Sequence, residues 1–309
     1  MYKDVVTMNV LLIGAGALGK LIAAQLARSG TKIQVLVRRE EQMKAIRERG
    51  VCVNHNNTTY TQKLEVFTEI SDLTPDVVIL TVKSYQTEEA AKQITRLCNS
   101  PTVLSLQNGL GNEIPLAKYC SKDRIMLGVC THGVTALSDT TVAWNGVGEI
   151  LIGSKRHTLA PSVERLVRLL SAAGLHARCS QHIEEDVWRK VLVNCAINPL
   201  TAVTRLKNGD LLEREDLLRI MRDVVDEAVR IAEAKGIKVG EIWPRVLDVC
   251  RKTAENRSSM LQDLEANRPT EIDALNGAIV KLAEEMSYPV PVNRTLVSLV
   301  RTLSSKEVI

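Results

Sequence analysis

Several features that would point to particular classes of protein are scarce in this chain. Aromatic residues make up only 3% of its 309 residues, and basic residues are interspersed with acidic ones, leaving a net charge of +4. A nucleic-acid-binding surface needs a basic stripe or stacking aromatic residues, so we expect no nucleic-acid partner. No apolar run approaches the roughly 20 residues that span a bilayer, so we expect no membrane association either.

The seven cysteines do not form a recognisable site. They are widely spaced, without a C-x-x-C pair or a nearby histidine pattern. We interpret them as reduced thiols in a cytoplasmic protein and predict no metal site. Residues 1–7 lack a signal-peptide core and precede a second methionine, Met8, so they could be a ragged start to the chain.

The first half of the chain has the rhythm of an α/β fold. Short apolar runs without polar alternation are typical of strands buried on both faces of a parallel sheet. They occur at residues 10–13, 33–37, 77–82, 103–106 and 126–129, with helical patterns at 18–29 and 40–49. Two more runs, 150–152 and 175–177, flank a helical pattern at 162–173 and could close the sheet. We predict a Rossmann-type, doubly wound parallel sheet.

After about residue 181 the strand signals stop. Helical patterns follow at 184–206, 211–235, 241–255 and 270–286, and no internal repeat is visible. We therefore predict two domains, an α/β domain at 1–181 and an all-helical domain at 182–309. The long amphipathic helices could support a homodimer.

A glycine-rich turn joins the first strand to the first helix. Gly14, Gly16 and Gly19 fit G-x-G-x-x-G, in which the glycines allow a tight turn, close approach of a pyrophosphate and close packing of helix on strand. The phosphates would sit at the start of the helix, where unpaired N–H groups favour negative charge. We expect dinucleotide contacts from the whole loop: Gly14, Ala15, Gly16, Ala17, Leu18 and Gly19.

The second strand is followed by Arg38 and Arg39. A binder of NAD usually has an acidic residue here for the ribose 2′-hydroxyl, whereas a guanidinium matches a 2′-phosphate. The pattern therefore favours NADP(H), although two solvated arginines in a loop would look the same. Lys83 and Asn108 follow later strands and should lie at the same edge of the sheet, as ligand contacts or as ordinary turn residues. Residues 131–133 follow the next run and are a weaker candidate.

In the helical half, Lys190, Asn194 and Asn198 recur every four residues and should share one helix face. Their neighbours are apolar, so the stripe either lines a cleft or pairs with a neighbouring domain. A partly desolvated lysine can donate a proton near neutral pH. Pro199 should end or kink this helix.

Two later segments mix helix-capping and binding signals. Ser259 and Gln262 have the spacing of a capping box, but a hydroxyl at a helix start can also bind a carboxylate. Thr270 is the expected N-cap of the next helix, with Asp273 as its partner. Glu271 is then either part of the cap chemistry or a functional acid.

Taken together, these motifs resemble the ketopantoate reductases (2-dehydropantoate 2-reductases) over nearly the whole chain. The shared motifs are GAGALG, TVK, QNG, W-x-K-x-x-x-N-x-x-x-NPLTA, NGDL, SSMLQD and R-x-TEID-x-LNG. The resemblance implies an N-terminal Rossmann domain, a helical C-terminal domain and a substrate cleft between them. It also implies NADPH-dependent reduction of 2-dehydropantoate to (R)-pantoate, a step toward pantothenate and coenzyme A.

The resemblance also implies roles for individual residues. Lys190 matches the family's proton donor, and Glu271 matches an acid near the nicotinamide that orients substrate and cofactor. The implied substrate contacts are Asn108, Lys190, Asn194, Asn198, Asn208, Asn256, Ser258 and Ser259. The implied cofactor contacts are the glycine loop, Arg38, Lys83, Asn108, Glu271 and, where the match is poor, Val134.

Two alternatives stay open. A related NADP-dependent dehydrogenase could act on another 2-oxo or 2-hydroxy acid, because the Rossmann half is widely shared. A non-enzymatic NADP(H)-binding regulator would use the same cofactor site, but it would have no need of Lys190 and Glu271.

Overall fold

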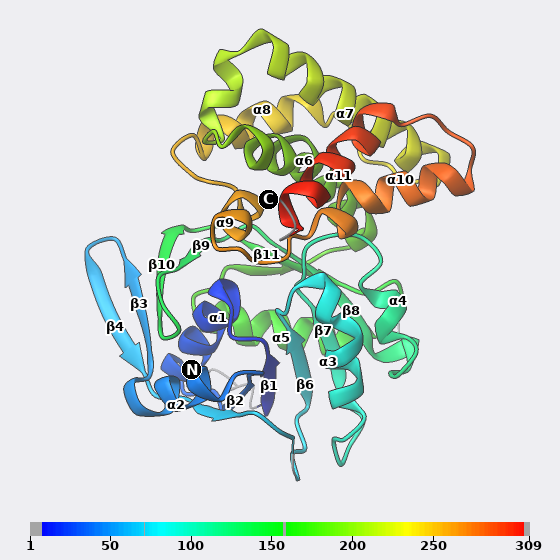
Figure 1. The fold of residues 1–309 in the computed structure, drawn as a ribbon. Coiled ribbons are helices and arrows are strands. Elements are labelled where there is room, and N and C mark those ends of the chain that lie inside the picture. The colour runs from blue at the N-terminus through cyan, green and yellow to red at the C-terminus, as the bar shows by residue number, and fades with distance from the viewer. Residues whose placement is uncertain (1–7, 71, 157–158, 306–309) are drawn as a thin grey trace. The chain divides into compact units, whose positions relative to one another are not determined.

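The computed structural model describes residues 8–70, 72–156 and 159–305 (Figure 1). The predicted ragged start at 1–7 lies outside these residues. The chain divides into two compact units, which we call the first unit (Met1–Gln107 and Asn112–Ile183) and the helical unit (Asn108–Gly111 and Glu184–Ile309). The single boundary predicted from the sequence lies between residues 181 and 182, and the packing of Asn108–Gly111 with the helices was not predicted.

An eight-stranded sheet forms the centre of the first unit, in the order β12-β11-β8-β7-β6-β1-β2-β5. The strands are β1 (Val10–Ile13), β2 (Ile33–Leu36), β5 (Glu65–Phe67), β6 (Val77–Leu80), β7 (Thr102–Ser105), β8 (Ile125–Cys130), β11 (Ile150–Gly153) and β12 (Ala177–Cys179). Neighbours pair in parallel except β8 and β11, which are antiparallel. The predicted doubly wound sheet is confirmed. Strand β11 matches the run predicted at 150–152, and β12, which closes the sheet beside it, begins only at the last residue of the run predicted at 175–177.

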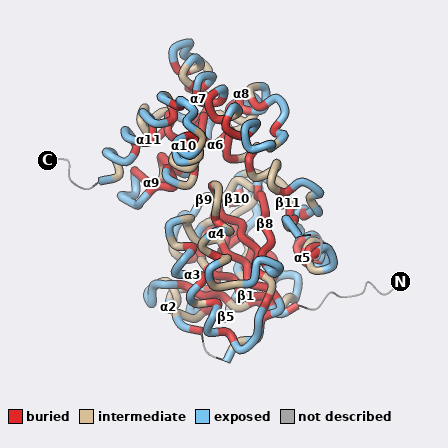
Figure 2. Tube along the Cα trace, turned by 90° about the vertical axis from the view of Figure 1, so that its right-hand side faces the viewer, coloured by how far each residue is buried: buried red, intermediate tan, exposed pale blue. Residues whose placement is uncertain are grey.

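The central strands are apolar throughout because both faces of the sheet are covered. In β1, Val10 and Leu12 join a core that also contains residues of α1 (Ala17–Arg28), α2 (Glu40–Arg49) and α5 (Ala160–Ala172). Leu11 and Ile13 join a second core with α3 (Thr87–Ile94) and α4 (Glu113–Leu116). Figure 2 shows buried residues along β1 and β8.

A second sheet of four strands, not predicted from the sequence, lies against α1. Its order is β4-β3-β10-β9, with β3 at Val51–His55, β4 at Thr58–Gln62, β9 at Gly133–Ala136 and β10 at Thr141–Gly146. Strand β10 pairs in parallel with β3 and antiparallel with β9. Helix α1 contacts β3, β4, β9 and β10, so this sheet adds a layer beside the helix that follows the glycine loop.

The helical unit packs its helices around one apolar core. They are α6 (Ile183–Thr204), α7 (Glu215–Ala234), α8 (Trp243–Lys252), α9 (Ser259–Glu265), α10 (Asn276–Glu285) and α11 (Pro291–Ser304), with short 3₁₀ turns η4 (Gly209–Glu213) and η5 (Ile272–Ala274). The helices predicted at 184–206, 211–235 and 241–255 are present as α6, α7 and α8, whereas the helix predicted at 270–286 begins only at Asn276; α11 was not predicted. None of the described helices combines the length and apolarity that a bilayer crossing requires.

The sequence predicted that Pro199 would end or kink α6. It does not end the helix, which continues to Thr204. Proline has no N–H to donate to the carbonyl four residues earlier. That carbonyl, on Cys195, instead accepts from the side-chain Nδ2 of Asn276 at 3.1 Å. The same Nδ2 donates to Asn293 Oδ1 at 3.0 Å, and Asn293 Nδ2 donates to the buried carboxylate of Glu227 at 2.8 Å. A buried polar network therefore replaces the hydrogen bond that Pro199 cannot make, and α6 continues past it.

Candidate functional site

The glycine loop has the conformation that a dinucleotide requires. Gly14 has a φ of +104°, and a Cβ there would lie 2.7 Å from Val82 Cγ1. A Cβ on Gly19 would collide with the carbonyl of Gly14, so this glycine lets α1 pack closely on the turn. A Cβ on Gly16 would meet nothing within 4 Å, which leaves its backbone open to a ligand. With no acidic residue in the first turn of α1, the loop suits a pyrophosphate.

The loop lies at the topological switch point of the large sheet, between β1 and β6. Thr81, just after β6, donates its hydroxyl to the carbonyl of Gly14 at 2.6 Å. Gln107, just after β7, donates Nε2 to the carbonyl of Val82 at 3.1 Å. The half-buried Lys83 lies between these contacts, at the carboxyl edge of the sheet, where folds of this kind commonly bind ligands. Thr81 and Gln107 position the backbone around the glycine loop. The sequence did not predict these contacts, although both residues belong to the TVK and QNG motifs.

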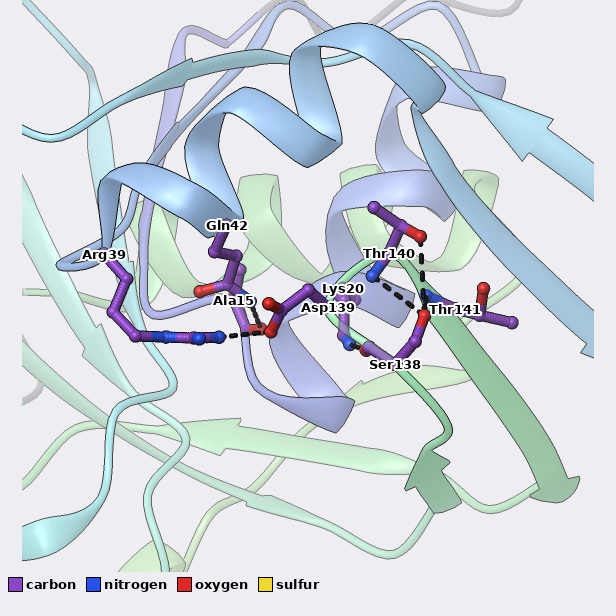
Figure 3. A network of polar contacts seen from close by, with 8 residues as sticks. All are labelled: Ala15, Lys20, Arg39, Gln42, Ser138, Asp139, Thr140 and Thr141. Atoms are coloured by element: carbon purple, nitrogen blue, oxygen red, sulfur yellow. Dashed lines mark hydrogen bonds and ion pairs between the residues drawn. The ribbon is translucent and has the colours of Figure 1, made fainter.

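The two arginines after β2 have different surroundings. Arg38 is exposed and makes no ion pair or side-chain hydrogen bond with the described residues. Arg39, the N-cap residue of α2, forms an ion pair with Asp139 in the turn between β9 and β10 (Figure 3). Beside them the buried Lys20 donates to the carbonyl of Ser138. Burial lowers the pKa of Lys20 from 10.5 to about 8, with Asp139 opposing and Arg39 assisting the shift.

Val134 lies in β9, opposite Trp144 of β10, and is half-buried against the core of the first unit. Its predicted cofactor contact stays a prediction. Thr131, from the weaker candidate segment, helps to line a depression of about 630 Å³ with Glu149 and Arg178. Apart from Thr131, none of the predicted site residues lines that depression.

In the helical unit, one small hollow, with about 190 Å³ of empty space, gathers predicted residues that are far apart in the sequence. Asn108, Asn198, Ser259 and Glu271 line it, together with Met260, Asp263 and Leu275. Asn108 donates Nδ2 to Glu271 Oε2 at 3.4 Å. Asp263, which we did not predict, is 2% exposed and is paired with Arg268 at 3.0 Å.

Close packing fixes Asn108 in this hollow. The backbone N–H of Leu110 donates to the carbonyl of Ala274 in η5 at 2.9 Å. Gly109 has a φ of +95°, and a Cβ there would lie 2.5 Å from the Cβ of Ala274. The residues of the QNG motif thus have different contacts: Gln107 donates to the segment that follows β6, whereas Asn108 and Gly109 pack within the helical unit.

The predicted stripe on α6 has Asn198 buried and Lys190 and Asn194 half-buried. Of the three, only Asn198 lines the hollow; Asn194 lies one turn earlier on the same helix and Lys190 two turns earlier. Asn208 and Asn256 also lie outside it. They contact each other through the backbone, where Asn208 N–H donates to Asn256 C=O at 3.0 Å.

The caps of two helices differ from the prediction. Ser258, not Ser259, is the N-cap of α9, and its Oγ accepts from the Leu261 N–H at 3.1 Å and from the Thr201 hydroxyl at 2.7 Å. The local sequence pattern cannot show which of the two adjacent serines caps α9. The hydrogen bond from Thr201, on α6, fixes Ser258 in that role. Ser259 is thereby left exposed at the hollow.

Thr270 is not an N-cap. The segment after it forms the 3₁₀ turn η5, for which Glu271 is the N-cap residue without a side-chain cap bond. Asp273, its expected partner, instead pairs with Arg301 of α11 at 2.6 Å. The Glu271 side chain makes no cap bond, is 6% exposed and accepts from Asn108. Helix capping therefore does not account for an acid at this position. Among the described residues, no cluster of side chains could hold a metal ion.

Comparisons with known proteins identify the family of the chain. Residues 10–157 match the family described as "Ketopantoate reductase PanE/ApbA", and residues 182–304 match its C-terminal part. A 2-dehydropantoate 2-reductase from Archaeoglobus fulgidus is 38% identical, covering 96% of this chain and 98% of that protein. A ketopantoate reductase structure from Ralstonia eutropha has a TM-score of 0.87 at 30% identity, covering 96% and 98% of the two chains.

A structure of D-mandelate dehydrogenase with NADH and anilino(oxo)acetate has a TM-score of 0.91 at 26% identity, covering 96% of this chain and 98% of that one. The family matches together span most of the chain, and the Archaeoglobus relative aligns with nearly all of it. The chain is therefore an oxidoreductase that belongs to the ketopantoate reductase family.

Proposed function

We propose that the protein catalyses the NADPH-dependent reduction of 2-dehydropantoate to (R)-pantoate, a step toward pantothenate and coenzyme A. The observation that carries this proposal is the hollow of the helical unit. Asn108, Asn198, Ser259 and Glu271, which are separated by up to 163 positions, are brought together there. Hydroxyl, amide and carboxyl groups of this kind can bind the carboxylate and hydroxyl groups of a small hydroxy acid.

The first unit would hold the cofactor. Its glycine loop has the backbone openness at Gly16 and the uncapped helix start that a pyrophosphate needs. Arg38 supports NADP(H) over NAD(H), because its guanidinium is exposed and has no ion-pair partner among the residues that the structure describes. NADPH, when bound, supplies the hydride for the ketone carbon.

The helical unit would hold the substrate and supply the proton. Hydride addition places negative charge on the carbonyl oxygen, and Lys190 is the proposed general acid that protonates it. Glu271, held by Asn108, would orient the substrate. The exposed Ser259 would bind the carboxylate, and Asn194 and Asn198 the hydroxyl groups. Asn208 and Asn256 would act farther out, because neither lines the hollow.

A second candidate is reduction of another 2-oxo acid. The similarity to D-mandelate dehydrogenase favours it, since that protein was solved with anilino(oxo)acetate. A cytoplasmic location and a homodimer stay predictions.

Replacing Lys190 with alanine tests the proposed reaction. We expect kcat with 2-dehydropantoate to fall by about 10²–10⁴-fold while the Kd for NADPH is unchanged. Lys281→Ala is the matched control, because Lys281 is an exposed lysine of α10 in the same unit. A kcat within threefold of wild type for Lys190→Ala would refute the general-acid role.

A further inference from the structure

The turn between β9 and β10 brings a carboxylate to the arginines of the cofactor site. Asp139 pairs with Arg39, and the side chains are 39% and 49% exposed, so a ligand can reach both. Arg38, one residue earlier, has no such partner among the described residues. The three side chains therefore present a net charge of +1 to a ligand, where the two arginines alone would present +2.

This pairing is built into the turn. Ser138 Oγ accepts from the backbone N–H groups of Thr140 and Thr141 at 3.2 and 3.0 Å. Lys20, only 2% exposed, donates from α1 to the carbonyl of Ser138 (Figure 3). Most exposed ion pairs join two freely moving side chains, whereas Asp139 is held by a braced backbone.

The same network reaches the glycine loop. Gln42, in the first turn of α2, donates Nε2 to the carbonyl of Ala15 at 2.9 Å (Figure 3). Lys20 directly follows Gly19, the last glycine of the motif. The end of the second strand of a dinucleotide-binding fold reads the ribose 2′-position. Asp139 therefore stands beside the group that distinguishes NADPH from NADH.

We infer that Asp139 is a specificity-determining residue that limits the preference for NADPH over NADH. It neutralises Arg39 and sets a negative charge next to the 2′-position. A 2′-phosphate must either separate Asp139 from Arg39 or bind beside a like charge. The 2′-hydroxyl of NADH meets neither penalty and can donate a hydrogen bond to a carboxylate. The inference rests on the cofactor site of the proposed function and deepens it.

The test is direct binding of both nucleotides, followed by the fluorescence of the reduced nicotinamide. We expect Asp139→Asn to lower the Kd for NADPH about three- to tenfold, as for removal of one partly exposed charge, and to leave the Kd for NADH within about twofold. The gain should shrink at high ionic strength, because salt screens exposed charges.

Asp123→Asn is the matched control. It makes the same change in net charge, and Asp123 pairs with Arg156 at 3.4 Å. It lies in η2 (Lys122–Arg124), just before β8 and hence at the opposite edge of the sheet from the glycine loop. The control should leave the ratio of the two Kd values unchanged.

The inference is overturned if Asp139→Asn leaves the ratio of Kd values at the wild-type value. It is also overturned if NADPH binding weakens, because Asp139 would then be aligning Arg39 for the phosphate. Asp139→Ser repeats the test should the asparagine variant fold poorly. Failure of wild type to bind either nucleotide would overturn both this inference and the proposed function. A shifted ratio without reduction of 2-dehydropantoate would overturn only the proposed reaction.

Discussion

The passage of α6 through Pro199 gives a prediction about the helix that carries Lys190. Asn276 replaces the missing helical donor by giving Nδ2 to the carbonyl of Cys195, and also donates to Asn293. Asn276, Cys195 and Asn293 are each 0% exposed, so water cannot take over these bonds. Asn276→Ala would therefore leave two buried acceptors without their donor.

The expected cost follows from those two acceptors. An unsatisfied buried polar group costs about 1–3 kcal/mol, so Asn276→Ala should lower the free energy of unfolding by about 3 kcal/mol. With Pro199→Ala also present, residue 199 regains an N–H that can donate to the carbonyl of Cys195. The asparagine should then matter less, and we expect its replacement to cost about 1 kcal/mol less in that background.

Thermal unfolding followed by circular dichroism at 222 nm measures the effect. A loss of about 3 kcal/mol should lower Tm by about 6–12 °C for a unit of this size. Pro244→Ala is the control background, because Pro244 lies at the start of α8, outside the network. Equal costs of Asn276→Ala in the wild-type, Pro199→Ala and Pro244→Ala backgrounds would refute the idea that this asparagine compensates for the proline.

Three further predictions concern the two halves of the site. Ser258→Ala should lower stability by about 1–2 kcal/mol in thermal melts by removing the α9 cap, whereas Ser259→Ala should spare Tm and raise KM for 2-dehydropantoate several-fold; the reverse pattern would contradict the assigned roles. Because the pKa of Lys20 is lowered to about 8 in the folded state, the unfolded chain binds more protons between pH 8 and 10.5, and stability should rise across that window by up to about 3 kcal/mol. The difference in free energy of unfolding between wild type and Lys20→Met, measured by denaturant unfolding, should show this rise. Its absence would mean that Lys20 is not the source. Arg38→Asp should raise the Kd for NADPH about tenfold to a hundredfold and affect NADH much less; equal losses would remove Arg38 from recognition of the 2′-phosphate.

The central sheet could be predicted from the sequence because its strands are buried on both faces. A run such as Val77–Leu80 contains no polar residue, so it cannot be mistaken for a loop. The second sheet offered no such signal. In β4 every residue is exposed or half-exposed, and β3 pairs with β10 about 90 residues away. Pairing of that kind depends on tertiary structure, which short-range patterns do not report.

The same distinction applies to the site. The glycine loop and Arg38 could be proposed as cofactor contacts because their chemistry follows from a local motif. Asp139 could not, since its approach to Arg39 requires the β9–β10 turn to fold against α1. The α9 cap was placed one residue too late for a similar reason, because the hydroxyl of Thr201 on another helix identifies Ser258.

The most direct test of the proposed function is the rate of nucleotide oxidation with a panel of 2-oxo acids. The panel should contain 2-dehydropantoate, pyruvate and benzoylformate, the 2-oxo acid that corresponds to mandelate, each with NADPH and with NADH. We predict that kcat/KM is highest for 2-dehydropantoate with NADPH, by at least about tenfold over the other acids. A higher kcat/KM for benzoylformate, or no oxidation of either nucleotide with 2-dehydropantoate, would contradict the account.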